Sequence, residues 1–116
     1  MRIRIVTQRL PHTASLEELV HKRLYGALGR LVRSIDNAVV SFEDVNGPRG
    51  GQDIECRIRL LVRAGSEINV SAVAALPSTA LSDASHRARR CLMTRTRRGW
   101  MRRRRPRRLR SPVRVA

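Results

Sequence analysis

Alternation of apolar and polar residues with a period of two is the feature that most restricts how this chain can fold. It is clearest over residues 54–63 (IECRIRLLVR), where Cys56, Ile58, Leu60 and Val62 share one side and charged residues occupy most of the other. Such a pattern predicts a β-strand with only one buried face. Shorter runs at residues 2–7, 38–43 and 67–74 predict three more strands of the same kind. The side chains expected on the buried side of these three are Ile3, Ile5, Val40, Phe42, Ile68, Val70, Ala72 and Ala74.

Two segments have the spacing of amphipathic helices. Ser15 and Glu18 are placed as in a capping box, which predicts a helix from near Ser15 to about Val32. A second helix is predicted to open at residues 76–79, because Pro77 suits a first helical turn. The predicted buried stripes are Leu16, Leu19, Val20, Leu24, Ala27, Leu28 and Leu31 on the first helix, and Ala80, Leu81, Ala84, Ala88, Cys91 and Leu92 on the second.

The predicted order is therefore β-α-β-β-β-α, with a loop at residues 44–53 and a hairpin turn at residues 64–66. Because every strand is apolar on one face only, both helices must cover that face. The expected fold is a two-layer α/β (α+β) sandwich with a four-stranded mixed sheet. Arg95 falls in the middle of the second apolar stripe, so packing should end near residue 94. We expect a domain at residues 1–95 and an arginine-rich tail, disordered or partly helical, at residues 96–116.

Positive charge is concentrated in the last third of the chain. The formal net charge is +16, from 25 Lys+Arg against 9 Asp+Glu, and no acid follows Asp83. Such a block of like charge usually binds polyanions. Basic residues also flank both apolar stripes, and two helices side by side could merge them into one basic groove. On the second helix, Arg87 and Arg90 are predicted on one flank, with Arg89 projecting more outward. The candidate RNA-binding residues are Lys22, Arg23, Arg30, Arg33, Arg87, Arg89, Arg90, Arg95, Arg97 and Arg98.

Other classes of function find little support in the residues. No catalytic set converges in a predicted pocket, so we expect no enzyme, no small-molecule substrate, no cofactor and no metal site. Cys56 and Cys91 are too few for a disulfide framework and are both predicted to be buried. No apolar run is long enough to cross a bilayer, and the tail has little apolar anchor, so no membrane partner is expected. A reduced, cytoplasmic setting is expected.

The stretch from Val40 to Arg59 (VSFEDVNGPRGGQDIECRIR) resembles the matching segment of the ribosome hibernation promoting factor family, also called ribosome-associated inhibitor or sigma-54 modulation proteins. Residues 74–81 (AALPSTAL) are similar to the entry of the family's last helix. The resemblance covers residues 1–95 and implies the same β-α-β-β-β-α fold. It also implies binding to ribosomal RNA of the small subunit, in the channel for mRNA and tRNA, and inhibition of translation.

Family basic positions on the two helices match Arg23, Arg30, Arg87 and Arg90. Two features depart from the family. Leu76 and Pro77 replace an acid-aromatic pair, and an arginine-rich tail stands where long members carry a dimerisation domain. Self-association therefore stays open. The alternative from the residues alone is a general DNA- or RNA-binding protein that acts through its tail.

Overall fold

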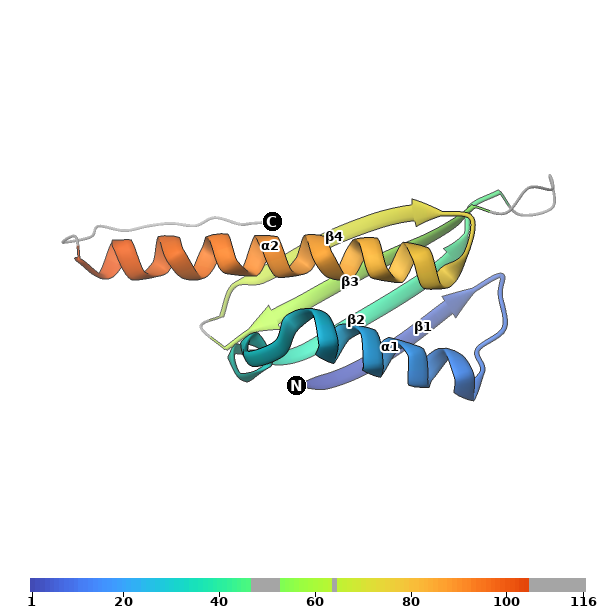
Figure 1. Cartoon of the computed structure of the whole chain (residues 1–116), viewed down its shortest axis with the longest axis horizontal. Helices are drawn as coiled ribbons and strands as arrows, with labels where there is room; N and C mark the ends of the chain where they lie inside the picture. The colour runs from blue at the N-terminus through green and yellow to red at the C-terminus, as the bar shows by residue number, and fades with distance from the viewer. Residues whose placement is uncertain (47–52, 64, 105–116) are drawn as a thin grey trace.

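The computed structural model describes residues 1–46, 53–63 and 65–104, with side chains up to residue 95. Its elements follow the order β-α-β-β-β-α (Figure 1), with a short 3-10 helix after the first α-helix. The bounds are β1 Arg2–Gln8, α1 Ala14–Leu28, η1 Gly29–Ser34, β2 Ile35–Asp44, β3 Ile54–Val62, β4 Glu67–Ala74 and α2 Pro77–Arg104.

The four strands form one mixed sheet in the order β1-β2-β3-β4. β1 pairs with β2 in parallel, whereas β2–β3 and β3–β4 are antiparallel. The register aligns Ile5 with Val40 and Phe42 with Cys56, so the apolar residues of neighbouring strands lie on the same face. The predicted fold class is confirmed.

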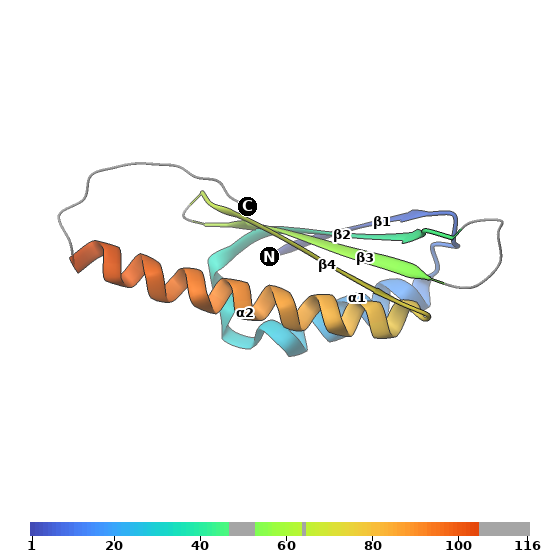
Figure 2. The same ribbon diagram turned by 90° about the horizontal axis from the view of Figure 1, so that it is seen from above.

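Both α-helices lie on the apolar face of the sheet and leave the other face open (Figure 2). Phe42 is 1% exposed and lies under these helices, together with Leu24 of α1 and Leu81 of α2. Burial of a side chain of this size contributes about 1.5–3 kcal/mol relative to its exposure to water. One core thus joins the strands to both helices.

Helix α1 differs from the prediction at both ends. Thr13, not Ser15, caps it, since the Thr13 hydroxyl oxygen accepts a hydrogen bond of 3.1 Å from the Leu16 N–H. The α-helix ends at Leu28 instead of Val32. Gly29 has a positive φ of 54°, and its N–H bonds the Tyr25 carbonyl, as is typical of a helix end. The chain then continues as the 3-10 helix η1.

Helix α2 begins at Pro77, as predicted, and its backbone stays helical to Arg104. Among its side chains described, up to residue 95, the last buried one is Leu92. Cys91 is exposed, so its prediction as a buried residue was wrong. It lies at the border of the apolar stripe, where a small rotation of the helix decides between sheet and solvent. Residues 105–116 of the predicted tail lie outside the described residues.

The connections between strands agree with the sequence where they are described. β2 and β3 are joined by a hydrogen bond of 3.0 Å from the Val45 N–H to the Asp53 carbonyl, and residues 47–52 of the predicted loop lie outside the description. At the β3–β4 turn, Gly65 has a φ of 96° and its N–H bonds the Val62 carbonyl at 2.8 Å. Residue 64 of that turn is also outside the described residues. None of the helices described is long and apolar enough to span a membrane.

The two thiols should differ sharply in reactivity. Cys56 is fully buried, and burial raises its pKa to about 12, whereas Cys91 is exposed. We expect a thiol reagent to modify one cysteine of the native protein quickly at pH 8, and two after unfolding in guanidinium. Two fast-reacting thiols in the native protein would contradict this packing.

Candidate nucleic-acid interface

The two helices run in the same direction across the sheet. β4 is parallel to β1, because two antiparallel pairings separate it from β2, and each helix follows one of these strands directly. Both helices therefore begin at one end of the sheet and run back to the other (Figure 1). Their C-terminal ends, which favour positive charge, lie at the same end of the domain.

A side-chain contact fixes how α1 and α2 meet. The Arg23 guanidinium of α1 donates a hydrogen bond to the hydroxyl oxygen of Ser82 on α2. Ser85, one turn further along α2, is 1% exposed. Such small side chains on this flank of α2 let α1 approach closely. Arg23 therefore lies over the seam between the helices.

The same contact helps to place three other predicted binding residues. Arg89 follows Ser82 by seven residues, or about two turns, so it lies on the side of α2 that faces α1. Because the helices are parallel, this brings Arg89 to the level of η1, which carries Arg30 and Arg33. Helix geometry therefore predicts that Arg23, Arg30, Arg33 and Arg89 lie on the same side of the domain. Arg89 is exposed, and its outward projection stays a prediction.

Arg87 lies elsewhere. Its guanidinium donates a hydrogen bond of 2.5 Å to the backbone carbonyl of Ser71 in the edge strand β4. Five residues separate Arg87 from Ser82, or about 140° around the helix, which puts Arg87 on the flank away from α1. The prediction that Arg87 flanks the groove is therefore corrected. Arg90 is exposed, and its guanidinium has no hydrogen-bond partner among the residues described with side chains. It lies between the two flanks, toward solvent.

Four arginines on the outer sheet face and its borders are held by carboxylates, whereas Arg2 and Arg4 of β1 have no ion pair among the residues described with side chains. Glu55 pairs with Arg57 at 3.2 Å, and Glu67 pairs with Arg59. Hydrogen bonds from Arg59 and Asn69 lower the pKa of Glu67, so this pair persists well into the acidic range. Two further pairs are Arg63–Asp36 at 3.5 Å and Arg9–Glu43 at 3.7 Å.

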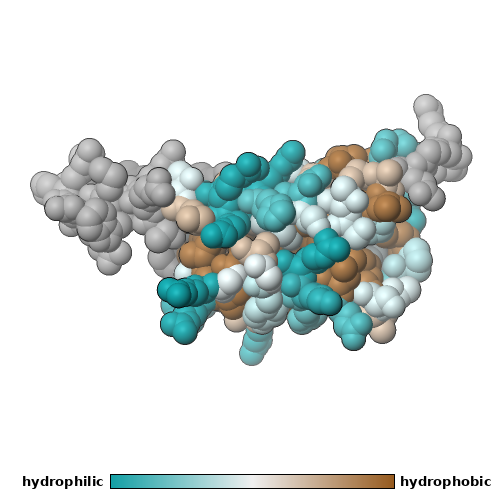
Figure 3. Space-filling model, viewed as in Figure 1, coloured by the Kyte–Doolittle hydropathy of each residue, from teal (hydrophilic) through white to brown (hydrophobic). Residues whose placement is uncertain are grey.

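The cations on the helices are in the opposite situation. Among the residues described with side chains, no carboxylate lies within ion-pair distance of Lys22, Arg23, Arg30, Arg33, Arg87, Arg89, Arg90 or Arg95. The acids of α1 and α2 lie near the start of each helix, at Glu17, Glu18 and Asp83. Hydrophilic side chains spread over both helices on this side of the molecule (Figure 3). The helical side thus presents uncompensated positive charge, which suits a polyanion.

Beyond the core, the predicted binding residues follow the axis of α2. Arg95 is half-buried, and Arg97 and Arg98 lie on the helical backbone that continues to Arg104. The backbone of α2 runs here past the sheet, toward the end at which α1 also terminates (Figure 1).

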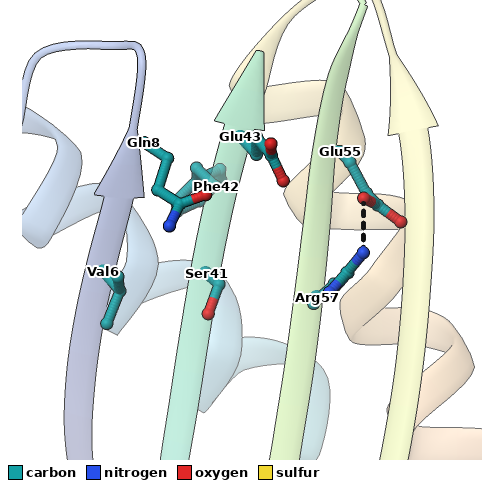
Figure 4. A pocket seen from close by; sticks show the side chains of 7 residues that line it. All are labelled: Val6, Gln8, Ser41, Phe42, Glu43, Glu55 and Arg57. Carbon is teal, nitrogen blue, oxygen red and sulfur yellow. Dashed lines mark ion pairs between the residues drawn. The ribbon is translucent and has the colours of Figure 1, made fainter. Parts of the chain in front are cut away.

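The outer sheet face contains a small depression of mixed polarity. It is lined by Val6, Gln8, Ser41, Phe42, Glu43, Glu55 and Arg57 (Figure 4). The Glu55–Arg57 ion pair crosses part of it, so its charges are already compensated. Among the described residues, no group of three or more His, Cys, Asp or Glu side chains is placed to hold a metal ion. The helical side is accordingly the stronger candidate site.

Comparison with known proteins shows a likeness of fold. No protein-family model and no curated protein matches the chain. Among solved structures, a ribosomal subunit interface protein from Coxiella burnetii aligns with a TM-score of 0.72 at 18% identity, covering 84% of this chain and 99% of that one. The N-terminal domain of Thermus thermophilus Protein Y aligns with a TM-score of 0.65 at 21% identity, covering 81% and 98%. The fold implied by the sequence resemblance is thereby confirmed.

Arg87 and Arg90 should differ in their effect on stability. We expect Arg87→Gln to lower the free energy of unfolding by about 1 kcal/mol, because it removes a hydrogen bond to the edge strand. The matched change Arg90→Gln should stay within about 0.5 kcal/mol of the parent, as is usual for exposed sites. Urea denaturation of both variants checks this. Equal effects would contradict the asymmetry between the two flanks.

Proposed function

We propose that this protein is a non-catalytic, ribosome-associated factor of the hibernation type. It binds ribosomal RNA of the small subunit in the mRNA and tRNA channel, and thereby inhibits translation in the cytoplasm. The observation that carries the proposal is the distribution of ion pairs among the residues described with side chains: eight cations on the helical side have no carboxylate partner, whereas four arginines on and around the outer sheet face are paired, Arg2 and Arg4 excepted.

The fold supports this proposal independently of the charge. One structural neighbour is named as a ribosomal subunit interface protein, and the other is the N-terminal domain of Protein Y. The alignments cover nearly the whole of both neighbours, so the likeness extends over the entire sandwich. The proposal carries the ribosome association of the first neighbour's name over to this chain.

Phosphate contacts are the mode of recognition that suits the surface. The outer face of the central strands carries Val39, Ser41, Arg57 and Arg59. The one ring that borders the depression on this face, Phe42, is 1% exposed, so a base has no open ring there on which to stack. Tyr25 is engaged elsewhere, since its ring stacks on His21 with a centroid distance of 6.4 Å. Arginine's planar fork fits phosphate oxygens in pairs. The proposed binding thus depends on the shape and backbone of folded RNA.

Inhibition follows from occupancy in this proposal. A protein seated in the channel excludes mRNA and tRNA by volume, and no bond is made or broken. Affinity comes from cations that replace the counterions of RNA phosphates, so it should fall with salt at a log–log slope of roughly −0.7 to −0.9 for each phosphate contacted.

A pair of charge reversals tests which side binds. Arg30→Glu with Arg90→Glu changes the helical side, and Arg2→Glu with Arg4→Glu makes the same change of net charge on the outer side of β1. We expect the first variant to bind ribosomes at least about tenfold more weakly, and the second to stay within about threefold of the parent, because only the first loses phosphate contacts. Cosedimentation with small subunits at two salt concentrations measures both.

Equal losses in the two variants would show that binding follows net charge instead of this surface. A parent protein that stays in the ribosome-free fraction at both salt concentrations would reject the proposed function.

The alternative, a general nucleic-acid binder that acts through its tail, makes a different prediction. Deletion of residues 97–116 removes ten arginines and would then abolish binding, with naked duplex DNA competing as well as ribosomes. On the proposal made here, the truncated domain keeps measurable affinity for small subunits, because Arg23, Arg30, Arg33 and Arg89 remain. Filter binding with DNA and ribosomes as competitors separates the two functions.

A further inference from the structure

The register of the sheet shows which backbone groups of β1 point away from the other strands. β1 lies at one edge of the sheet, with β2 beside it (Figure 1). The Val45 N–H bonds the Asp53 carbonyl, so the odd-numbered residues of β2 point their backbone groups toward β3. The even-numbered residues of β2 then point toward β1, where the parallel register pairs them with even-numbered residues. The residues of β1 whose N–H and C=O groups point to the open edge are Ile3, Ile5 and Thr7.

The side-chain contacts at the two edges of the sheet differ. On β1, the Tyr25 hydroxyl bonds the Met1 carbonyl at 3.5 Å, which agrees with the odd-numbered residues pointing outward. Among the residues described with side chains, no other side chain bonds a group on this edge. On β4, Arg87 bonds the Ser71 carbonyl in the middle of the strand, so a further strand would have to displace it. Of the two edges, β1 is therefore the one open to another strand.

The apolar side of β1 is incompletely covered. Ile3 and Ile5 pack against the core but are only partly buried. Their partners on β2, Ala38 and Val40, are at most 1% exposed. Apolar side chains of a strand beside β1 would complete the burial of Ile3 and Ile5, which favours association.

The outer side of β1 carries two arginines without acidic neighbours. Arg2 and Arg4 are exposed, and their partners on β2 are Asn37 and Val39. Among the residues described with side chains, neither arginine has a carboxylate within ion-pair distance, whereas the arginines at the centre of β3 do. Side chains two residues apart on a strand share a face and lie about 6.8 Å apart. Two acids with this spacing on an added strand would pair with both arginines.

We propose that β1 is a docking edge for an extended acidic peptide, which joins the sheet as an antiparallel strand. The peptide backbone bonds the open groups of Ile3, Ile5 and Thr7, and acids at alternate positions pair with Arg2 and Arg4. Its apolar residues, on the opposite side, lie beside Ile3 and Ile5. Antiparallel pairing is expected because it is the more stable per residue.

Other occupants fit this edge less well. A second copy of β1 brings arginines and no acid. An RNA phosphate could pair with the arginines, but it offers no donor to the carbonyls on the edge. Because the edge lies apart from the basic residues of the helices, the proposal goes beyond ribosome binding.

Two peptides of equal composition test the proposal on the full-length protein. In TVEVEVT, with both ends blocked, the glutamates share one face of a strand, whereas TVVEEVT places them on opposite faces. We expect the first peptide to bind about five- to tenfold more tightly in fluorescence anisotropy, because only it can pair with both arginines. Equal binding would indicate attraction by net charge alone and would overturn the proposal.

Methylation of peptide N–H groups tests the backbone bonds without a change of charge. In the antiparallel arrangement, the valine N–H groups of TVEVEVT point toward β1, and the glutamate N–H groups point away from it. N-methylation of the central valine should therefore abolish binding, and N-methylation of one glutamate should change it less than about threefold. Any other pattern would overturn antiparallel strand addition.

The two charge-reversal variants described above assign the peptide to this edge. Arg2→Glu with Arg4→Glu should bind the peptide at least about tenfold more weakly, because both ion pairs are lost. Arg30→Glu with Arg90→Glu should stay within about threefold of the parent. Affinity of the first variant for small subunits shows that it is folded.

Two results with these variants would overturn the proposal. One is full peptide binding by the variant with Arg2→Glu and Arg4→Glu. The other is a loss of small-subunit binding in that variant as large as in the helical variant, which would make RNA the partner of this edge. The peptide assay contains no RNA, so a parent protein that binds the peptide but not ribosomes would reject the proposed function alone.

Discussion

The burial of a single apolar sheet face is the interaction on which the rest of the structure depends. Phe42 and the apolar side chains around it must be shielded from water. Because β1 and β4 are parallel, the helices that follow them start at the same end of the sheet and pack on that face. Each helix then has only its far side and flanks left for polar residues. The basic residues of α1, η1 and α2 are thereby brought to one side of a small domain, although Lys22 and Arg95 lie 73 residues apart in the chain.

Charge pairing turns this arrangement into two different surfaces. On the outer sheet face, neighbouring strands place arginines within reach of carboxylates, as for Arg59 and Glu67. The helices have no such partners near their C-terminal ends, because their acids lie near their N-terminal ends. An arginine that is already paired with a carboxylate contributes little binding energy when RNA approaches. An unpaired arginine contributes more, because it can replace counterions of the RNA. The helical side is therefore the side on which binding energy is available.

The sequence was sufficient for the strands, their order and the face that they bury, because period-two alternation depends only on local geometry. The sequence was less reliable where two local arrangements are about equally favourable, as at the border of a buried stripe or at a helix start with two good capping residues. Cys91 lies at the border of the stripe and was predicted on the wrong side of it. Thr13 and Ser15 are both good caps, and only the path of the loop after β1 selects Thr13.

For the candidate site, too, the sequence predicted one part and left another to the structure. Its basic residues could be chosen from the sequence, but their grouping could not, because it depends on partners from other elements. Arg23 bonds Ser82, and Arg87 bonds the carbonyl of Ser71. Neither partner has a sequence signal, since serine hydroxyls and strand carbonyls occur throughout the chain. The contacts of Arg23 and Arg87 therefore had to come from the structure.

The natural thiol of Cys91 allows the most direct test of the claim that the helical side lies against ribosomal RNA. An iron chelate attached there generates hydroxyl radicals that cut nearby RNA, and a second protein carries the chelate on the outer sheet face, at Asn69→Cys in a Cys91→Ser background. The account predicts strong cuts in small-subunit RNA around the mRNA and tRNA channel from Cys91, and weak or no cuts there from position 69. Equal cutting from both positions, or cuts confined to the probe on the sheet, would contradict it.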